Sequence, residues 1–391
     1  MAEASGTIDI RFLRDVRHGG DPDQLARVGA DLASFVLAST TSIDLAIYDF
    51  RLTDPDTTAL VVAALVNAAD RGVTVRIGYD AGKPAPGTAA DFARLQADPA
   101  PPGTAAWISE HFAGTRVMTK GITAGGQLMH CKYVIRDAPA AAALQHGAPA
   151  AGATVPGAIS SLAPSRGPAV WTGSTNFTDD AWTRQENNII VVRDEQVSGA
   201  FRIDFDQMWA TGSIKGTGKN DAGATTVAGG VLGWDFCPGD GKNVNAALAA
   251  RITAATTRLI LASMVVTSHE VLAALAAAVD RGLPLTGIYD GGQMDPIVAQ
   301  WKANPHDVGV LANWQKVAAH LARKDSTPYT PTSVHDFMHL KVLISDDEVT
   351  TGSYNFSSNA QRNAENQIHL TDRVTVAAYV DYVDAVMGAY A

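Results

Sequence analysis

Cysteine is scarce in this sequence, and so are long apolar runs. The 391 residues include only Cys131 and Cys237. Two cysteines are too few for a disulfide framework, and they form no Cys-x-x-Cys pair that would suggest a zinc site. We therefore expect two buried thiols, with a single disulfide as the open alternative. No apolar run approaches the length of a bilayer crossing, so we expect no transmembrane segment.

Positive charge is also in short supply. Lysine and arginine total 30 against 40 aspartates and glutamates, which gives a formal net charge of −10. Proteins that bind nucleic acid through many phosphates usually present a basic surface. The net negative charge disfavours nucleic acid as a partner. A local basic groove on an otherwise acidic protein is the open alternative.

The N-terminal residues MAEASGTIDIRF lack a basic region followed by an apolar stretch. We therefore expect no signal peptide and a cytoplasmic protein, with a secreted mature form as the alternative. Apolar residues make up 46% of the chain and charged residues 18%, which is enough for a substantial core. The length fits one large domain or two ordinary ones.

The chain repeats itself, and the matching blocks occur in the same order in each half. AADRGVTVRIGYDAG (68–82) resembles AVDRGLPLTGIYDGG (278–292), and TGSTNFTDDA (172–181) resembles TGSYNFSSNA (351–360). RQENNIIVV (184–192) also has a counterpart, in which Glu186 is aligned with Glu365 and Ala364 lies beneath Gln185. Blocks repeated in one order indicate an internal duplication.

Each half alternates predicted strands with Ala-rich helices, and each helix ends at an Arg-Gly pair. This pattern predicts an α/β fold with two related halves, each a mixed sheet flanked by helices. We expect the first half at 1–210, a flexible linker at 211–230 and the second half at 231–391. The Ala/Gly/Pro-rich stretch at about 138–170 has no counterpart and is predicted to be a surface insertion, with a substrate-covering flap as the alternative.

The most informative repeat is MHCKYVIRD (129–137), which recurs as MHLKVLISD (338–346). Alternate residues of a strand share a face, so His130 and Lys132 point the same way, as do His339 and Lys341. An imidazole beside an ammonium is an unfavourable pair to bury without an anion. The pair suits a phosphate, since lysine supplies charge and histidine supplies a nucleophile or a proton.

These motifs resemble the signature of the phospholipase D superfamily. That signature is His-x-Lys-x4-Asp with a downstream Gly-Gly/Ser-x-Asn, usually present twice. Here it reads HCKYVIRD with GSTN, and HLKVLISD with GSYN, and the duplication extends the resemblance over most of the chain. The departures are the long first-half insertion and a slightly short connection in the second half, and neither removes a motif residue.

The resemblance implies two halves packed about a pseudo-twofold axis, with both His-Lys pairs lining one pocket. One histidine forms a phosphohistidine, and the other protonates the leaving alcohol and then activates water or an acceptor alcohol, without a metal ion or other cofactor. By family precedent His130 is the nucleophile and His339 the general acid; the sequence leaves the reverse order open. The implied catalytic set is His130, Lys132, Asn176, Glu186, His339, Lys341, Asn355 and Glu365.

Within that set the lysines and asparagines would hold the non-bridging oxygens. Glu186 and Glu365 would each accept a hydrogen bond from the far ring nitrogen of a histidine and fix its tautomer.

Other residues of the motifs have weaker assignments. Ser174 and Ser353 either assist substrate binding or only shape their turns. His335 lies one sheet-face repeat from His339 and is expected at the pocket rim. Asp137 and Asp346 follow the His-Lys strands and are expected to be structural.

The substrate is less well determined than the chemistry. The acidic total, the two motif copies in one chain and the absent membrane span favour hydrolysis of phospholipid head groups by a monomer. The alternatives are a metal-independent nuclease of the same superfamily, or a non-catalytic binding scaffold. A nuclease should surround its pocket with basic residues, and Arg323 with Lys324 is the only nearby cluster.

Overall fold

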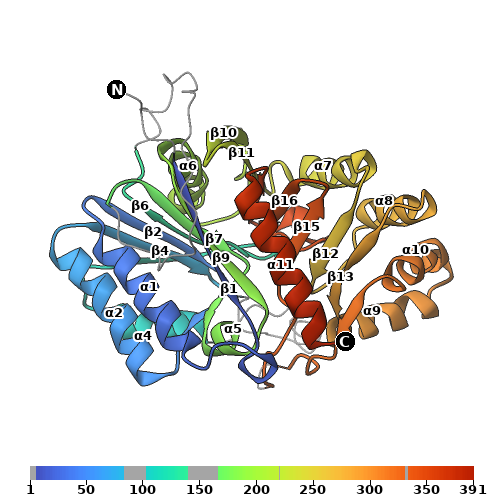
Figure 1. The fold of residues 1–391 in the computed structure, drawn as a ribbon. Helices are drawn as coiled ribbons and strands as arrows, with labels where there is room; N and C mark the ends of the chain where they lie inside the picture. The colour runs from blue at the N-terminus through green and yellow to red at the C-terminus, as the bar shows by residue number, and fades with distance from the viewer. Residues whose placement is uncertain (1–5, 83–102, 140–165, 220, 331–332) are drawn as a thin grey trace.

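The computed structural model describes residues 6–82, 103–139, 166–219, 221–330 and 333–391. In these residues two large sheets lie side by side, one formed by each half of the chain (Figure 1). The predicted insertion at 138–170 lies mostly outside the described residues.

The two sheets share one strand order, which confirms the predicted pair of related α/β halves. The first has the order β1-β9-β7-β6-β2-β4-β5, and the second has β11-β17-β16-β15-β12-β13-β14 with β10 added at the edge of β11. The strands of the first sheet are β1 (Thr7–Leu13), β2 (Ser42–Ile47), β4 (Thr74–Asp80), β5 (Met118–Ile122), β6 (Lys132–Arg136), β7 (Ala169–Gly173) and β9 (Asn187–Arg193). Those of the second are β10 (Gly223–Val227), β11 (Gly230–Cys237), β12 (Leu259–Ser263), β13 (Leu285–Asp290), β14 (Ala322–Lys324), β15 (Lys341–Ser345), β16 (Glu348–Gly352) and β17 (Glu365–Leu370). A short parallel pair, β3 (Phe50–Arg51) and β8 (Phe177–Thr178), completes the strands.

Helices cover the outer faces of both sheets and fill the space between them (Figure 1). The outer helices of the first half are α1 (Gln24–Leu37), α2 (Pro55–Asp70) and α4 (Thr104–Phe112), with the short α5 (Asp179–Thr183) near one sheet edge. Those of the second half are α7 (Gly241–Ala254), α8 (His269–Asp280), α9 (Gly291–Ala303) and α10 (Val308–Ala318). The central helices are α6 (Glu195–Thr211) and α11 (Arg373–Ala389), and single 3-10 turns lie at Val16–His18, Pro305–Asp307 and Ala360–Arg362.

The matching helices begin and end where the sequence pattern predicts. The side chain of Asp54 caps α2 and that of Ser268 caps α8, each accepting a backbone N–H of the first turn. Both helices end one residue before the Arg-Gly pair, where Gly72 and Gly282 adopt positive φ angles of 93° and 77°. Glycine takes this conformation without the steric cost of a Cβ atom, so it stops the helix.

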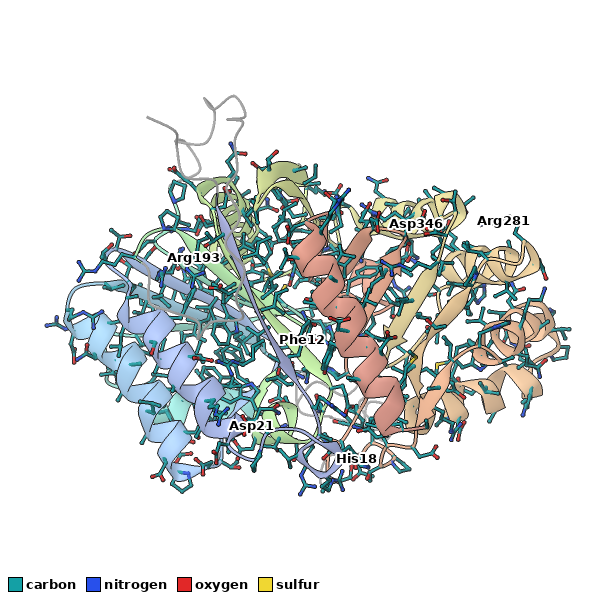
Figure 2. All side chains as sticks on the ribbon, viewed as in Figure 1. Phe12, His18, Asp21, Arg193, Arg281 and Asp346 are labelled. Carbon is teal, nitrogen blue, oxygen red and sulfur yellow. The ribbon has the colours of Figure 1, made fainter. Side chains whose placement is uncertain are left out.

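The largest core lies between the two sheets and joins the halves. It contains apolar residues from the facing sides of both sheets, from α6 and from α11. Phe12 of β1 stacks on Tyr382 of α11 with ring centroids 4.2 Å apart, and meets Tyr379 edge-on (Figure 2). Both cysteines are buried and unbridged, as expected.

Two connections differ from a simple duplication. The segment 211–230, predicted to be a flexible linker, contains β10, which pairs antiparallel with β11. The link between β1 and α1 spans residues 14–23, whereas the equivalent link between β11 and α7 spans only 238–240. In the described ranges no helix is both long enough and apolar enough to cross a membrane.

Candidate active site

Both His-Lys segments lie at the same edge of their sheets, where β4 and β13 end and where β6 and β15 begin. A buried carboxylate at each strand end fixes the adjacent segment. Asp80 Oδ2 accepts the backbone N–H of Met129, and Asp290 Oδ2 accepts that of Met338, both at 2.7 Å. Burial raises the pKa of Asp290 to about 6. The two aspartates therefore position the segments that carry the histidines.

The two halves exchange hydrogen bonds at this edge. The His130 N–H donates to the carbonyl of Ala364 at 2.9 Å, and the His339 N–H donates to the carbonyl of Glu186 at 3.1 Å. Each histidine segment therefore pairs with the start of a strand from the other half. This crossed pairing brings the histidines into one buried site, where each is at most 6% exposed.

His130 is held by a carboxylate. Its Nδ1 lies 2.8 Å from Glu365 Oε2, which also accepts the hydroxyl of Ser353 at 2.7 Å. The other carboxylate oxygen accepts the side-chain amide of Asn363 at 3.1 Å. Burial lowers the pKa of His130 to about 4, although the Glu365 carboxylate opposes the shift. The imidazole is therefore neutral at pH 7, with Nδ1 engaged and Nε2 free of protein hydrogen bonds in this network.

His339 is held by an amide, and here the predicted contact of Glu186 is wrong. His339 Nδ1 lies 2.9 Å from Asn187 Oδ1, one residue beyond the predicted glutamate. The Glu186 side chain turns away and binds Lys324 Nζ and the Tyr390 hydroxyl, each at 2.6 Å. Burial, reinforced by the charges of Lys341 and Lys132, lowers the pKa of His339 well below its usual value.

The error is a shift of one residue in the alignment of the repeats. Ser174 N–H donates to the carbonyl of Asn188, and Ser353 N–H donates to that of Asn366. Asn188 therefore corresponds to Asn366, and Asn187 corresponds to Glu365. The sequences ENN and AEN allow two registers, and matching the glutamates selected the wrong one. Alignment of the strand interiors, Ile190 on Ile368, would have found Asn187.

The lysines of the motif are buried beside the histidines. Lys132 Nζ donates to the His130 carbonyl at 2.8 Å, and Lys341 Nζ donates to the His339 carbonyl at 2.6 Å. Burial lowers the pKa of Lys132 to about 8 and lowers that of Lys341 well below its usual value. Because burial disfavours both ammonium charges, a bound phosphate anion would offset part of the electrostatic cost of burying them.

The asparagines of the motif follow a sharp turn at the end of β7 and β16. Gly173 and Gly352 precede the turn with φ angles of 140° and 139°, and an added Cβ would approach the carbonyl oxygen of the adjacent strand within 2.4 Å. In both Asn176 and Asn355, Oδ1 is buried without a hydrogen-bond partner. Such groups are rare in native proteins. An amide oxygen is an acceptor, so any contact of these side chains with a phosphate would come from Nδ2.

Ser174 and Ser353 hydrogen-bond the side chains that contact the two histidines. The Ser174 hydroxyl donates to Asn187 Oδ1 at 2.7 Å and accepts the Asn188 N–H. The Ser353 hydroxyl likewise donates to Glu365 Oε2 at 2.7 Å and accepts the Asn366 N–H. Each serine hydroxyl therefore fixes the acceptor of a histidine.

The remaining predicted residues lie farther out. The His335 ring bonds the Thr330 carbonyl at 2.9 Å and stacks on Tyr329 and on Phe337, with ring centroids 5.0 and 5.3 Å away. Asp137 and Asp346 lie outside the site, each in a left-handed turn with φ near 50°. Figure 2 shows Asp346 at the opposite end of the strands from His18.

Those two aspartates bind the start of a neighbouring strand. Asp137 accepts the backbone N–H groups of Thr40, Thr41 and Ser42, and Asp346 accepts those of Thr256, Thr257 and Arg258. Burial by itself would raise the pKa of both carboxyls, but these hydrogen bonds together outweigh it and lower the pKa.

One pocket residue besides Asn187 escaped the sequence analysis. The Tyr48 ring lies 4.8 Å from the His130 ring, and Lys132 Nζ lies 5.0 Å from its centroid. Tyr48 follows β2, and its counterpart after β12 is Met264, since Ile47 and Ser263 pair equivalently with the two motif lysines. The position of Tyr48 directly after a predicted buried strand is the sequence feature that could have identified it.

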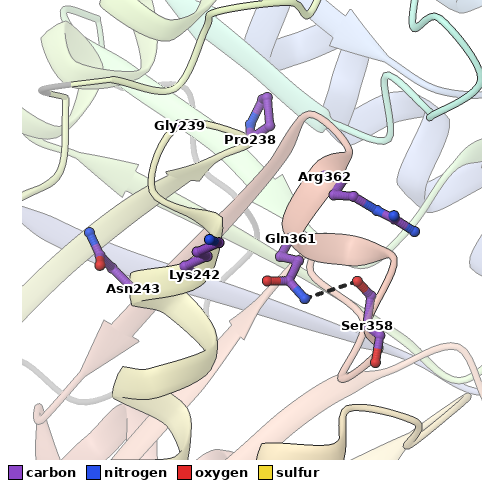
Figure 3. A pocket seen from close by; sticks show the side chains of 7 residues that line it. All are labelled: Pro238, Gly239, Lys242, Asn243, Ser358, Gln361 and Arg362. Atoms are coloured by element: carbon purple, nitrogen blue, oxygen red, sulfur yellow. Dashed lines mark hydrogen bonds between the residues drawn. The ribbon is translucent and has the colours of Figure 1, made fainter.

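A surface pocket of about 690 Å³ lies beside the second half of the site (Figure 3). It is lined by Pro238, Gly239, Lys242, Asn243, Ser358, Gln361 and Arg362. It occupies the region where the β11–α7 link is short, and none of the motif histidines, lysines or asparagines lines it. The side chains of Lys242 and Arg362 are exposed.

Comparison with solved structures supports the same architecture. The phosphatidylserine synthase of Haemophilus influenzae Rd KW20 aligns with 96% of this chain and 85% of its own, at 10% identity and a TM-score of 0.60. A polyphosphate kinase from Porphyromonas gingivalis aligns with 97% of this chain and 50% of its own, at 12% identity and a TM-score of 0.52. Nuc from Salmonella typhimurium, a phospholipase D family member, aligns with 40% of this chain and 92% of its own, at 20% identity and a TM-score of 0.31.

The first two of these structures show a shared fold and no more. No curated protein is significantly similar to the chain in sequence. The family described as "Cardiolipin synthase, PLD-like domain" matches residues 33–209 and 248–387, which is most of both halves. The chain therefore belongs to the phospholipase D-like family of phosphodiesterase and phosphotransferase enzymes.

Proposed function

We propose that this protein hydrolyses phosphodiesters through a phosphohistidine intermediate, without a metal ion. One observation carries the proposal: two histidines share a buried site, and each is held through Nδ1 by an acceptor from the other half. This arrangement leaves Nε2 of each ring for chemistry. A nucleophile and a separate proton carrier are the groups that a two-step displacement requires.

The first step is attack of His130 Nε2 on phosphorus. His339, which carries its ring proton on Nδ1 in the free protein, takes up a second proton from solvent on Nε2 when the phosphodiester anion binds. The bond from phosphorus to the leaving oxygen breaks as His339 Nε2 donates that proton to that oxygen. In the second step His339 removes a proton from water, the water oxygen bonds to phosphorus, and the bond to His130 breaks. The products are an alcohol and a phosphomonoester, and both histidines return to their starting states.

The motif lysines and asparagines bind the phosphate in this scheme. Lys132 and Lys341, each bonded to the carbonyl of its motif histidine, would supply positive charge, and Asn176 and Asn355 would donate through Nδ2. Donors that are already oriented in a dry site stabilise developing charge strongly, because no solvent has to reorganise.

The electrostatics around the site favour a substrate with a single phosphate, such as a phospholipid head group. In the described residues, several basic side chains other than the motif lysines are paired with carboxylates, whereas Lys242 and Arg362 of the neighbouring pocket are exposed. Arg51 binds Asp49 at 2.7 Å, Arg17 binds Asp15 at 2.7 Å, and Lys324 binds Glu186 at 2.6 Å. Arg323 of the predicted basic cluster binds Asp295 at 2.8 Å. A nucleic acid strand needs a row of available cations along its backbone, which these pairs do not provide.

The test is a paired assay in excess chelator. Purified protein is given phosphatidylcholine vesicles in one series and single- and double-stranded DNA in another, alongside His130→Ala and the exposed-histidine control His320→Ala. Choline release that is lost only in His130→Ala supports the proposal. DNA cleavage without lipid turnover makes the protein a nuclease, and activity that requires added metal contradicts the metal-free mechanism. No turnover of either substrate by a folded protein favours a binding scaffold.

A further inference from the structure

Each histidine is held by a small set of side chains, here called its frame, and the two frames differ in one group. In each frame a serine hydroxyl and a side-chain amide hold the acceptor of histidine Nδ1. Around His130 that acceptor is the Glu365 carboxylate, and around His339 it is the Asn187 amide oxygen. The halves therefore give one histidine a negative charge and the other a neutral dipole.

The orientation of the Asn187 amide is fixed by its surroundings. Its Nδ2 donates to the backbone carbonyl of Ala181 and to Gln185 Oε1, both at 3.1 Å. Gln185 is oriented in turn, because its Nε2 donates to the His335 carbonyl at 2.8 Å. The Asn187 oxygen must then face His339 Nδ1, which carries the proton. Nε2 is the atom that His339 presents to substrate.

The charged groups facing each ring differ in the same sense. His339 faces the cations Lys341 and Lys132 and the His130 ring, and it hydrogen-bonds no carboxylate. His130 faces the same two lysines and the Tyr48 ring, but Glu365 offsets their charge. Asp290 and Glu186 reach the His339 segment only through the backbone of Met338 and His339, with the Glu186 carboxylate neutralised by Lys324.

This difference bears on which histidine can carry phosphorus. A histidine phosphorylated at Nε2 keeps its proton on Nδ1, so the ring is a cation throughout the intermediate. A carboxylate on Nδ1 stabilises that cation, whereas an amide beside two lysines does not. A proton donor has the opposite need: an imidazolium without a carboxylate partner gives up its proton more readily.

We propose that Asn187 is a positioning residue that commits His339 to proton transfer and leaves His130, with Glu365 behind it, as the nucleophile. The assignment rests on the proposed function. It agrees with family precedent on His130, but here the carboxylate–amide difference carries it. His339 takes up the Nε2 proton used in the first step once the phosphodiester anion lies between the two rings.

The first test needs no turnover. The ¹⁵N-histidine resonances of the free protein are followed from pH 4 to 9 in wild type, in Asn187→Asp and in the exposed control Asn67→Asp. In wild type the ring nitrogens of His339 should report the Nδ1–H tautomer. Asn187→Asp should raise the His339 titration by about 1 to 2 pH units and leave His130 within about half a unit, because the new carboxylate contacts only His339. An Nε2–H tautomer in wild type, or an unmoved His339 titration in the variant, overturns the proposal.

The second test uses bis(4-nitrophenyl) phosphate, whose leaving group departs without a proton donor. His339→Ala should release about one equivalent of nitrophenolate per enzyme in a burst and retain a phosphoryl label on His130, since the water-activating base is missing. His130→Ala should give no burst. A label on His339 in the His130→Ala protein reverses the roles and overturns the proposal. Failure of wild type to cleave any phosphodiester refutes the proposed function instead, and the resonance test still decides the effect of Asn187 on His339.

Discussion

The two halves of this chain are most instructive where they differ. Their sheets have one strand order, and their histidines, lysines, serines and asparagines occupy equivalent places. Yet the first half supplies Asn187 to the histidine of the second, and the second supplies Glu365 to the histidine of the first. The duplication keeps equivalent side chains in equivalent positions. One difference, Glu365 beside His130 and Asn187 beside His339, alters what each histidine can do.

The largest effect should come from removing either buried lysine. Lys132→Met and Lys341→Met are each expected to lower kcat/KM by about 10²- to 10³-fold, because a principal charge on the phosphate is lost. The melting temperature should hold or rise, because methionine carries no ammonium to desolvate. Steady-state kinetics with thermal denaturation check this. A melting temperature that falls along with activity would assign the lysines to folding instead.

A smaller loss of activity should follow when His130, like His339, has an amide instead of a carboxylate as the acceptor of its Nδ1. Glu365→Gln removes the negative charge behind His130 and is expected to lower kcat by about 10²-fold, because the phosphohistidine cation loses its partner. Single-turnover kinetics should show slower formation of the intermediate. The charge-matched control is Glu195→Gln, on the exposed start of α6, which should retain activity. An unchanged rate in Glu365→Gln would mean that the carboxylate only orients the ring.

The turn aspartates should affect stability and spare catalysis. Asp137→Ala and Asp346→Ala each remove a carboxylate that accepts several backbone N–H groups, and each is expected to cost about 2 kcal/mol of unfolding free energy. Because folding lowers the pKa of both carboxyls, their contribution is full above about pH 4 and is lost as pH falls further.

Denaturant titration of these variants at pH 7 and pH 3 measures the two effects. The gap between wild type and variant should narrow at pH 3. Activity per folded molecule should match wild type, and a selective loss of activity would place the aspartates in the site after all.

The smallest effect should come from the aromatic difference between the halves. Tyr48→Met copies the Met264 side and is expected to change KM two- to tenfold with little change in kcat, because the ring borders His130 and Lys132 without a role in proton transfer. Comparing Tyr48→Phe separates the hydroxyl from the ring. A kcat loss as large as that of Glu365→Gln would show that Tyr48 takes part in the chemistry.

The sequence alone predicted the duplicated α/β fold, the element order of each half and the motif residues, for a clear physical reason. Strand periodicity, helix ends at Arg-Gly and the His-x-Lys spacing are local properties, and each was present twice. Side-chain alternation also placed His130 with Lys132 and His339 with Lys341 on shared faces. The turn role of Asp137 and Asp346 followed from their position at a strand exit.

Only the tertiary structure showed which acceptor meets which histidine. Glu365 reaches His130, and Asn187 reaches His339, across the interface of the two halves, so no local pattern contains either contact. The choice between Glu186 and Asn187 depended on one residue of strand register, which is fixed by the pairing of β9 with β1 and β7 and by the core that those strands bury. The residue types and their spacing determined which chemical groups the site contains. The packing of one half against the other determined which acceptor contacts each histidine.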